Sequence, residues 1–314
     1  MTTTIQLLPP AVKKAFDDKL ISVPVPAMIH NVAASRRTMP SQSGTTLRMR
    51  QFQPLTTATV PLPDDGSRIP AQTLSAVDLD AEIQFFGTFI ALHERTTLQN
   101  ECPVLNEGVA RLAVCFRQTE DELTRSMLLS TASSISATDG TNGDSPTDPV
   151  RSDFDTVVRA LRKKDAPFIS DLIQGEDRFA TSPVGPAYLG MCDTNLIGHL
   201  DRVEGFKNIY QYPLTSKALP EEWGSIGNLR FLVSSIGSIE KSSSMLGRDV
   251  YNIFVTGKDG FGVINQDNYT SEFLYRPPLF HDELARVATV GWKMSYASRV
   301  LHDTWVTKFR VTLA

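Results

Sequence analysis

The sequence has few cysteines, no long apolar run and no excess of basic residues. Its 314 residues include three cysteines, Cys102, Cys115 and Cys192, and none of them belongs to a C-x-x-C pair. An odd number of cysteines without that spacing argues against a disulfide framework and against a zinc knuckle, so we expect reduced, structural thiols. No apolar run approaches the roughly 18 residues that a membrane span needs.

The charge balance is slightly acidic, with 31 basic against 35 acidic residues and a net charge of -4. Domains that hold nucleic acid tightly usually carry a strong basic excess, so the charge balance argues against a dedicated nucleic-acid binder, whereas it suits a protein that only surrounds DNA. The first thirty residues lack a continuous apolar core. We therefore expect no signal peptide and a protein that is cytosolic when made.

Catalytic patterns are also scarce. None of the five histidines has the spacing of a zinc-protease helix, so we expect surface or packing roles for them. Cys192 with Asp193 and His199 could form a thiol nucleophile and its base, but no cysteine-hydrolase signature surrounds them. We keep a cytosolic thiol hydrolase as an alternative from another class, and otherwise expect no enzyme activity, no cofactor and no metal site.

Two glycine-rich or polar segments resemble ligand loops only superficially. Residues 257–262 lack the spacing of a phosphate-binding loop, which favours a turn between strands. Residues 139–148 offer Asp139, Asn142, Asp144 and Asp148 as oxygen ligands, but without the twelve-residue calcium pattern a solvated loop is favoured.

Two segments, residues 45–55 and 82–92, read as long strands that pair with each other. In the first, Leu47 and Met49 alternate with Arg48 and Arg50, which indicates two distinct faces. Each would span on the order of 35 Å. A two-stranded ribbon is marginal alone, so we expect it to lie across the long helix of a neighbouring subunit and to bury its apolar side chains there. The candidate contact residues are Arg48, Arg50, Phe52, Phe85, Phe86 and Phe89; for the two arginines, a solvated face and ion pairs with a neighbour's acidic patch are both open.

The longest helical pattern runs from residue 103 to residue 139 and would be about 50 Å long. Gly108 suggests close packing within it, with a break into two helices as the alternative. A second helix is predicted over residues 152–164, with Ser152 as its cap and with Phe154, Val157, Val158 and Leu161 on one face. Short strands follow from residue 183 to 274, and the chain ends in two alternating segments, residues 288–296 and 305–313, that read as an antiparallel pair. The predicted core anchors are Leu112, Phe116, Phe231 and Trp292.

Three motifs follow one another near the C-terminal end of the sequence. They are Trp223-Gly-Ser-Ile-Gly-Asn-Leu-Arg-Phe231, then Tyr251-Asn-Ile-Phe-Val-Thr-Gly-Lys-Asp-Gly-Phe-Gly262, then Thr289-Val-Gly-Trp-Lys-Met-Ser-Tyr296. In this order they resemble the N4 gp56-like family of tailed-bacteriophage major capsid proteins. Residues 38–55 and 84–87 resemble the strands that enter and leave that family's extended loop.

The resemblance implies an α+β chain with the HK97-like coat fold. It implies an N-terminal arm (1–43), an extended hairpin loop (44–98), a peripheral domain with a long spine helix (99–182 and 276–314) and a mixed α/β axial domain (183–275). The implied function is a non-enzymatic subunit that self-assembles as pentamers and hexamers of an icosahedral virion head in the host cytoplasm. Implied partners are copies of itself, scaffolding, portal and decoration proteins, and weakly contacted double-stranded DNA, without a membrane. An encapsulin-type compartment shell is the structural alternative.

Overall fold

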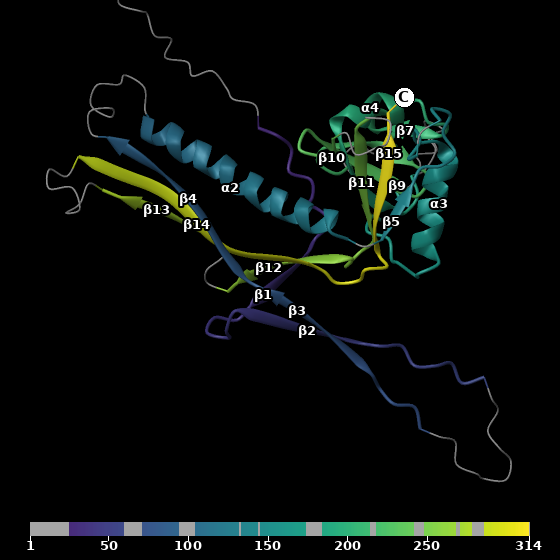
Figure 1. Cartoon of the computed structure of the whole chain (residues 1–314), viewed down its shortest axis with the longest axis horizontal. Helices are drawn as coiled ribbons and strands as arrows, with labels where there is room; N and C mark the ends of the chain where they lie inside the picture. Colours follow the sequence, from purple (N-terminus) through teal and green to yellow (C-terminus); the bar gives the residue numbers. More distant parts are fainter. Residues whose placement is uncertain are drawn as a thin grey trace, which may run out of the picture.

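The computed structural model describes residues 25–59, 71–93, 104–131, 133–143, 145–173, 184–213, 218–241, 248–267, 271–277 and 286–313. They form a rounded unit built on one sheet, an elongated layer in which a long helix lies along a second sheet, and a two-stranded ribbon that projects from the elongated layer (Figure 1). This confirms the predicted α+β class. Within these residues no helix is both long and apolar enough to span a membrane.

The rounded unit contains an eight-stranded sheet in the order β5-β15-β11-β6-β9-β8-β7, with β10 beside β11. Its strands are β5 (Ser134–Ser136), β6 (Tyr188–Asp193), β7 (Phe206–Asn208), β8 (Glu222–Ile226), β9 (Leu229–Ser234), β10 (Ser238–Glu240), β11 (Val250–Thr256) and β15 (Val306–Thr312). The short helices η3 (Thr194–Leu196), α4 (Ile197–Leu200) and η4 (Ile209–Gln211) connect them.

Helix α3 (Arg151–Arg162) packs on this sheet and confirms the second predicted helix. Its Phe154 meets Phe231 and Phe309 edge-on, with ring centroids 5.4 and 5.3 Å away. The prediction of Ser152 as the cap is wrong, because the helix starts one residue earlier. The Asp153 carboxylate accepts from the Val150 amide at 3.3 Å and fills the capping role.

The elongated layer contains a five-stranded sheet in the order β1-β12-β14-β13, with β4 also paired to β14. Its strands are β1 (Ser35–Met39), β4 (Gln84–His93), β12 (Phe261–Gln266), β13 (Ser271–Arg276) and β14 (Val287–Val300). Helix α2 (Val104–Leu129) lies along one face of this sheet (Figure 1). Their shared core explains why the long helix is stable.

Helix α2 is shorter than predicted. Its 26 residues span about 39 Å, and it ends at Leu129 instead of near residue 139. The Ser130 hydroxyl donates back to the Met127 carbonyl at 2.6 Å, and β5 then pairs with β15. The helix is continuous through Gly108, so the two-helix alternative is wrong. A Cβ there would lie 2.6 Å from Ile90 Cδ1, which confirms the close packing.

The two long strands predicted to pair with each other do not do so. β2 (Thr46–Phe52) pairs antiparallel with β3 (Ala76–Glu82), whereas β4 pairs with β14 over ten residues. Alternation predicted that these segments are strands but could not choose their partners. The pairing of β2 with β3 is favoured by charge, because β3 places aspartates opposite the arginines of β2. The position of β4 is favoured by burial, because one face of β4 is apolar and packs against α2.

The prediction that the last two strands pair with each other is also wrong. β14 belongs to the elongated layer, and β15 pairs with β11 and β5 in the rounded unit. The connection between them, at residues 301–305, therefore carries the chain from one sheet to the other. The turn predicted at residues 257–262 is confirmed and makes the same crossing, from β11 to β12.

Candidate assembly surfaces

The ribbon of β2 and β3 is held in register by two ion pairs. Arg48 binds Asp80 through Nε and Nη2 at 2.8 and 3.1 Å, and Arg50 binds Asp78 at 2.7 and 3.1 Å. These hydrogen bonds hold the pKa of both aspartates below its usual range. Both arginines thus have partners on their own ribbon, and their contact with a second subunit stays a prediction.

The base of the ribbon packs on its own subunit. Met49 and Ala81 are buried in a cluster with Ile264 of β12 and Leu301. Gln51 Nε2 also lies 3.2 Å from His302 Nδ1. The ribbon is therefore anchored at one end to the elongated layer.

The outer half of the ribbon has no such support among the described residues. Phe52, Leu55 and Leu74 are 59, 56 and 62 % exposed. The two segments stay linked beyond the strands: the Gln53 amide donates to the Ser75 carbonyl at 2.9 Å, and the Gln72 side chain bonds both the amide and the carbonyl of Thr56. The outer half of the ribbon thus presents exposed apolar side chains on an extended backbone.

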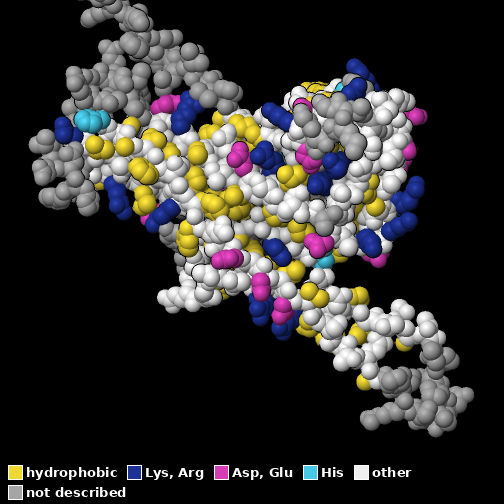
Figure 2. Space-filling model, in the orientation of Figure 1, with side chains coloured by type: hydrophobic (Ala, Val, Ile, Leu, Met, Phe, Trp, Pro, Cys, Tyr) yellow, Lys and Arg dark blue, Asp and Glu magenta, His cyan; other side chains and the backbone are white. Residues whose placement is uncertain are grey.

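A second apolar surface lies on the sheet face opposite α2, and we call it the open sheet face. Residues paired across a sheet share a face, so Phe89 lies there with Gly291, and Phe85 with Ser295. Phe85 and Phe89 are 63 and 69 % exposed. Figure 2 shows hydrophobic side chains gathered on one side of the elongated part of the molecule.

The open sheet face contains a groove of about 350 Å³. Gly87 and Gly291 line it between Phe89 and Leu274. A Cβ on Gly87 would lie 2.7 Å from the Trp292 carbonyl oxygen, so the strands approach too closely for a side chain there. The two glycines leave a depression beside the exposed Phe89 ring.

The other face of this sheet forms the core under α2. Phe86 and Ile90 point to it and pack with Leu112, which is 4 % exposed. Trp292 is 4 % exposed and meets the half-buried Phe116 edge-on, with centroids 5.4 Å apart. Of the three phenylalanines of β4 proposed as subunit contacts, the structure thus directs Phe86 inward and exposes the other two.

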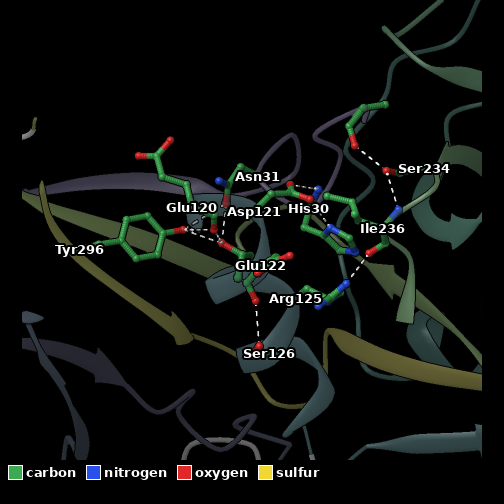
Figure 3. A network of polar contacts seen from close by, with 12 residues as sticks. His30, Asn31, Glu120, Asp121, Glu122, Arg125, Ser126, Ser234, Ile236 and Tyr296 are labelled. Carbon is green, nitrogen blue, oxygen red and sulfur yellow. Dashed lines mark hydrogen bonds and ion pairs between the residues drawn. The ribbon is translucent and has the colours of Figure 1, made fainter. Parts of the chain in front are cut away.

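A buried polar network joins the N-terminal stretch, α2 and β14 (Figure 3). Asp121 accepts from the His30 amide at 2.8 Å and lies 2.7 Å from His30 Nδ1, and both side chains are almost fully buried. Tyr296 and Thr124 share a 2.5 Å hydrogen bond, and both contact Asn31. Burial raises the pKa of the Tyr296 hydroxyl.

The same network reaches the rounded unit. Arg125 donates to the Ile236 carbonyl at 2.7 Å, and Ser234 donates to the Ala27 carbonyl at 2.5 Å. Residues 25–34 are therefore clamped between α2 and the rounded unit. Sequence patterns missed this network, because its partners His30 and Asp121 are 91 residues apart.

A buried ion pair explains the arginine of the first motif. Arg230 binds Glu222 at 2.7 and 2.5 Å, and Glu222 also accepts from Tyr212 at 2.6 Å. Both charged side chains are almost fully buried. Burial, followed by the hydrogen bond to Glu222, raises the pKa of Tyr212. Arg230 of β9 thus holds Glu222 at the start of β8, and Glu222 in turn holds Tyr212.

The candidate catalytic residues have no suitable environment. Cys192 is 1 % exposed, burial raises the pKa of its thiol, and Sγ contacts the Leu232 carbonyl at 3.4 Å. A protonated, buried thiol is a poor nucleophile. His199 is instead half-buried beside an open groove of about 620 Å³ that α3 and Arg202 also line.

The candidate calcium loop is closed by its own hydrogen bonds. Asp148 Oδ1 accepts from the amides of Thr141 and Asn142 at 2.9 and 3.1 Å, and Asp144 lies outside the described residues. In the part of the chain that the structure describes, no three His, Cys, Asp or Glu side chains are grouped to hold a metal.

Comparison with known proteins gives matches in structure but not in sequence. No family model and no curated protein matches the chain. The capsid of Ralstonia phage GP4 superimposes with a TM-score of 0.70 at 13 % identity, covering 100 % of this chain and 99 % of that one. The acid-stable capsid of Helicobacter pylori bacteriophage KHP30 gives 0.69 at 10 % identity, covering 97 % and 96 %. The capsid of cyanophage P-SCSP1u gives 0.68 at 11 % identity, covering 97 % and 94 %.

These matches define the class of fold. The chain has the HK97-like fold of bacteriophage capsid proteins over nearly its whole length.

Proposed function

We propose that this chain is the major capsid protein of a tailed bacteriophage, a non-enzymatic subunit of the icosahedral head that encloses double-stranded DNA. The observation that carries the proposal is the fit to phage capsid proteins over nearly the full length of both chains. Its location is then the virion, with assembly in the host cytoplasm. The order of the three C-terminal motifs supports the finer assignment to the N4 gp56-like family.

The proposal assigns roles to the parts of the chain. The ribbon is the extended loop, the layer with α2 as spine helix is the peripheral domain, and the rounded unit is the axial domain around which pentamers and hexamers close. Scaffolding, portal and decoration proteins are further partners that this role implies. The net charge of -4 suits a shell that encloses DNA without holding it tightly.

The main contact between copies is proposed to join the outer half of one ribbon to the open sheet face of a neighbour. Ribbon side chains such as Phe52 and Leu74 then cover Phe89 and the groove that Gly87 and Gly291 line. Both surfaces expose large apolar side chains, and exposed apolar patches mark interaction sites. This differs from the sequence-based expectation, in which the ribbon binds the neighbour's long helix.

Each such contact can be moderate in strength. In a closed shell every subunit binds several neighbours, and each contact raises the effective concentration of the next. An interface above about 2,000 Å² in total is typical of obligate assemblies. Replacing one apolar side chain at the centre of this contact by a polar one should therefore reduce assembly strongly, because the same contact is weakened at every subunit of the shell.

Sedimentation of the purified chain tests the proposal. We expect fast-sedimenting closed particles, which Phe89→Ser abolishes while the melting temperature of the free subunit stays unchanged. Tyr275→Ser is the matched control, because Tyr275 is 56 % exposed but pairs with Val290 and so lies on the opposite face of the same sheet. Loss of particles in both variants, or in neither, would argue against the open sheet face as the contact. Portal and terminase genes beside the coding gene would separate a phage head from an encapsulin-type shell.

A further inference from the structure

A second groove, of about 770 Å³, lies on the side of α2 near the N-terminal stretch. Residues 25–28 form one wall, Pro220 and Glu221 form another, and α2 contributes Ala110, Ala113 and Val114, with Arg117 at the rim. We propose that this groove, the α2 groove, binds residues 11–20 of the same chain as an amphipathic helix.

The surface of α2 in the groove is shaped for a helix. Ala110, Ala113 and Arg117 recur at steps of three and four, so they form one stripe along about 10 Å of the helix. Small side chains allow two helices to approach at the short end of the usual 8 to 10 Å separation. The stripe differs from the one facing the sheet, which contains Leu112 and Phe116.

The sequence of residues 11–20 matches this surface. Val12, Phe16 and Leu20 recur every four residues, and Ala15 lies beside them, so a helix over this segment has an apolar stripe. Lys14 falls on the opposite side. Ten helical residues extend about 15 Å, enough to cover the alanine stripe. The groove carries too little charge to favour a strongly polar partner, because its lining includes one cation and one anion, Arg117 and Glu221.

The clamp on residues 25–34 brings the segment to the groove. Residues 25–28 line the groove, and the bonds of Ala27 and His30 hold this stretch of the chain beside it. Only residues 21–24 separate the predicted helix from this anchor. A linker this short gives an effective concentration of about millimolar or more, so even weak docking is populated.

Thiol labelling of a cysteine placed in the groove tests the proposal on the full chain. Ala113→Cys, in a background with Cys102 and Cys115 changed to alanine, should react slowly, and the buried Cys192 should not interfere. Adding Phe16→Glu should accelerate labelling at least about tenfold, because a charge on the apolar stripe disfavours docking. Lys14→Glu introduces the same side chain on the opposite face and should leave the rate unchanged.

A control position on α2 and a dilution series show which segment covers position 113. The exposed Ser126, changed to cysteine, should label at one rate with and without Phe16→Glu, which shows that α2 stays folded. Equal labelling of position 113 with and without Phe16→Glu would overturn the proposal. Protection that disappears on dilution would also overturn it, since the occupant would then be a second copy. Labelling on the unassembled subunit makes the result independent of whether shells form.

Discussion

Replacing Trp292 by alanine tests the packing of the sheet under α2. The residue is 4 % exposed, and its ring lies edge-on to Phe116 at 5.4 Å. Truncating a buried Trp to Ala costs about 3 to 5 kcal/mol through lost burial and the cavity left behind. The indole Nε1 is buried without a hydrogen-bond partner among the described residues, so its removal recovers about 1 kcal/mol or more. We therefore expect a loss near the lower end, about 3 kcal/mol.

Urea unfolding of the unassembled subunit, followed by circular dichroism, measures this loss without relying on tryptophan fluorescence. The matched control is Phe89→Ala on the opposite face of the same sheet. Phe89 is 69 % exposed, so this variant should lose less than about 1 kcal/mol. If the alanine variant cannot be purified folded, Trp292→Phe should show a smaller loss of the same sign. A Trp292→Ala loss as small as that of the control would refute the reasoning.

Three further predictions concern other parts of the chain. Gly87→Ala should destabilise the subunit by about 1 to 3 kcal/mol, because the added Cβ would lie 2.7 Å from a carbonyl oxygen. Gly198→Ala in α4 is the control, because a Cβ there meets open space, and it should be neutral or slightly stabilising. Thermal unfolding of the free subunit measures both changes. The pKa values of Asp78 and Asp80 are lowered in the folded ribbon, so their pairing contributes above the unfolded pKa near 4 and is lost as pH falls through the folded values. Protease cleavage of the free subunit's ribbon should therefore accelerate in acid, and an unchanged rate would argue against this role. Asp121→Asn should cost about 1 to 3 kcal/mol in urea unfolding, because a neutral amide replaces the carboxylate that accepts from the buried His30 amide, and a loss near zero would show that the network contributes little.

Sequence patterns predicted a helix correctly where its buried side chains recur every three or four residues along the chain. Helix α3 was predicted from the spacing of Phe154, Val157 and Leu161, and all three are buried. The apolar stripe of α2 was predicted through Leu112 and Phe116, and the close packing at Gly108 is present. These signals are local, because a helix repeats its contacts every three or four residues.

The same patterns failed wherever a distant partner decides the structure. Alternation identified β2 and β4 as strands, but their partners lie in β3 and β14, and only the opposition of Arg48 and Arg50 to aspartates could have suggested the first. The end of α2 was missed because no Gly or Pro follows Leu129 before Gly140, so the sequence has no strong stop signal there, and the pairing of β5 with β15 ends the helix instead. The surfaces proposed for assembly combine strands far apart in the chain, so their geometry was not predictable.

Cryo-electron microscopy of particles formed by the purified chain tests the central claim most directly. The account predicts closed icosahedral shells in which the outer half of each ribbon, with Phe52 and Leu74, lies on the open sheet face of a neighbour, over Phe89. Protein that stays monomeric at all concentrations, or particles in which the ribbon folds back on its own subunit, would contradict it.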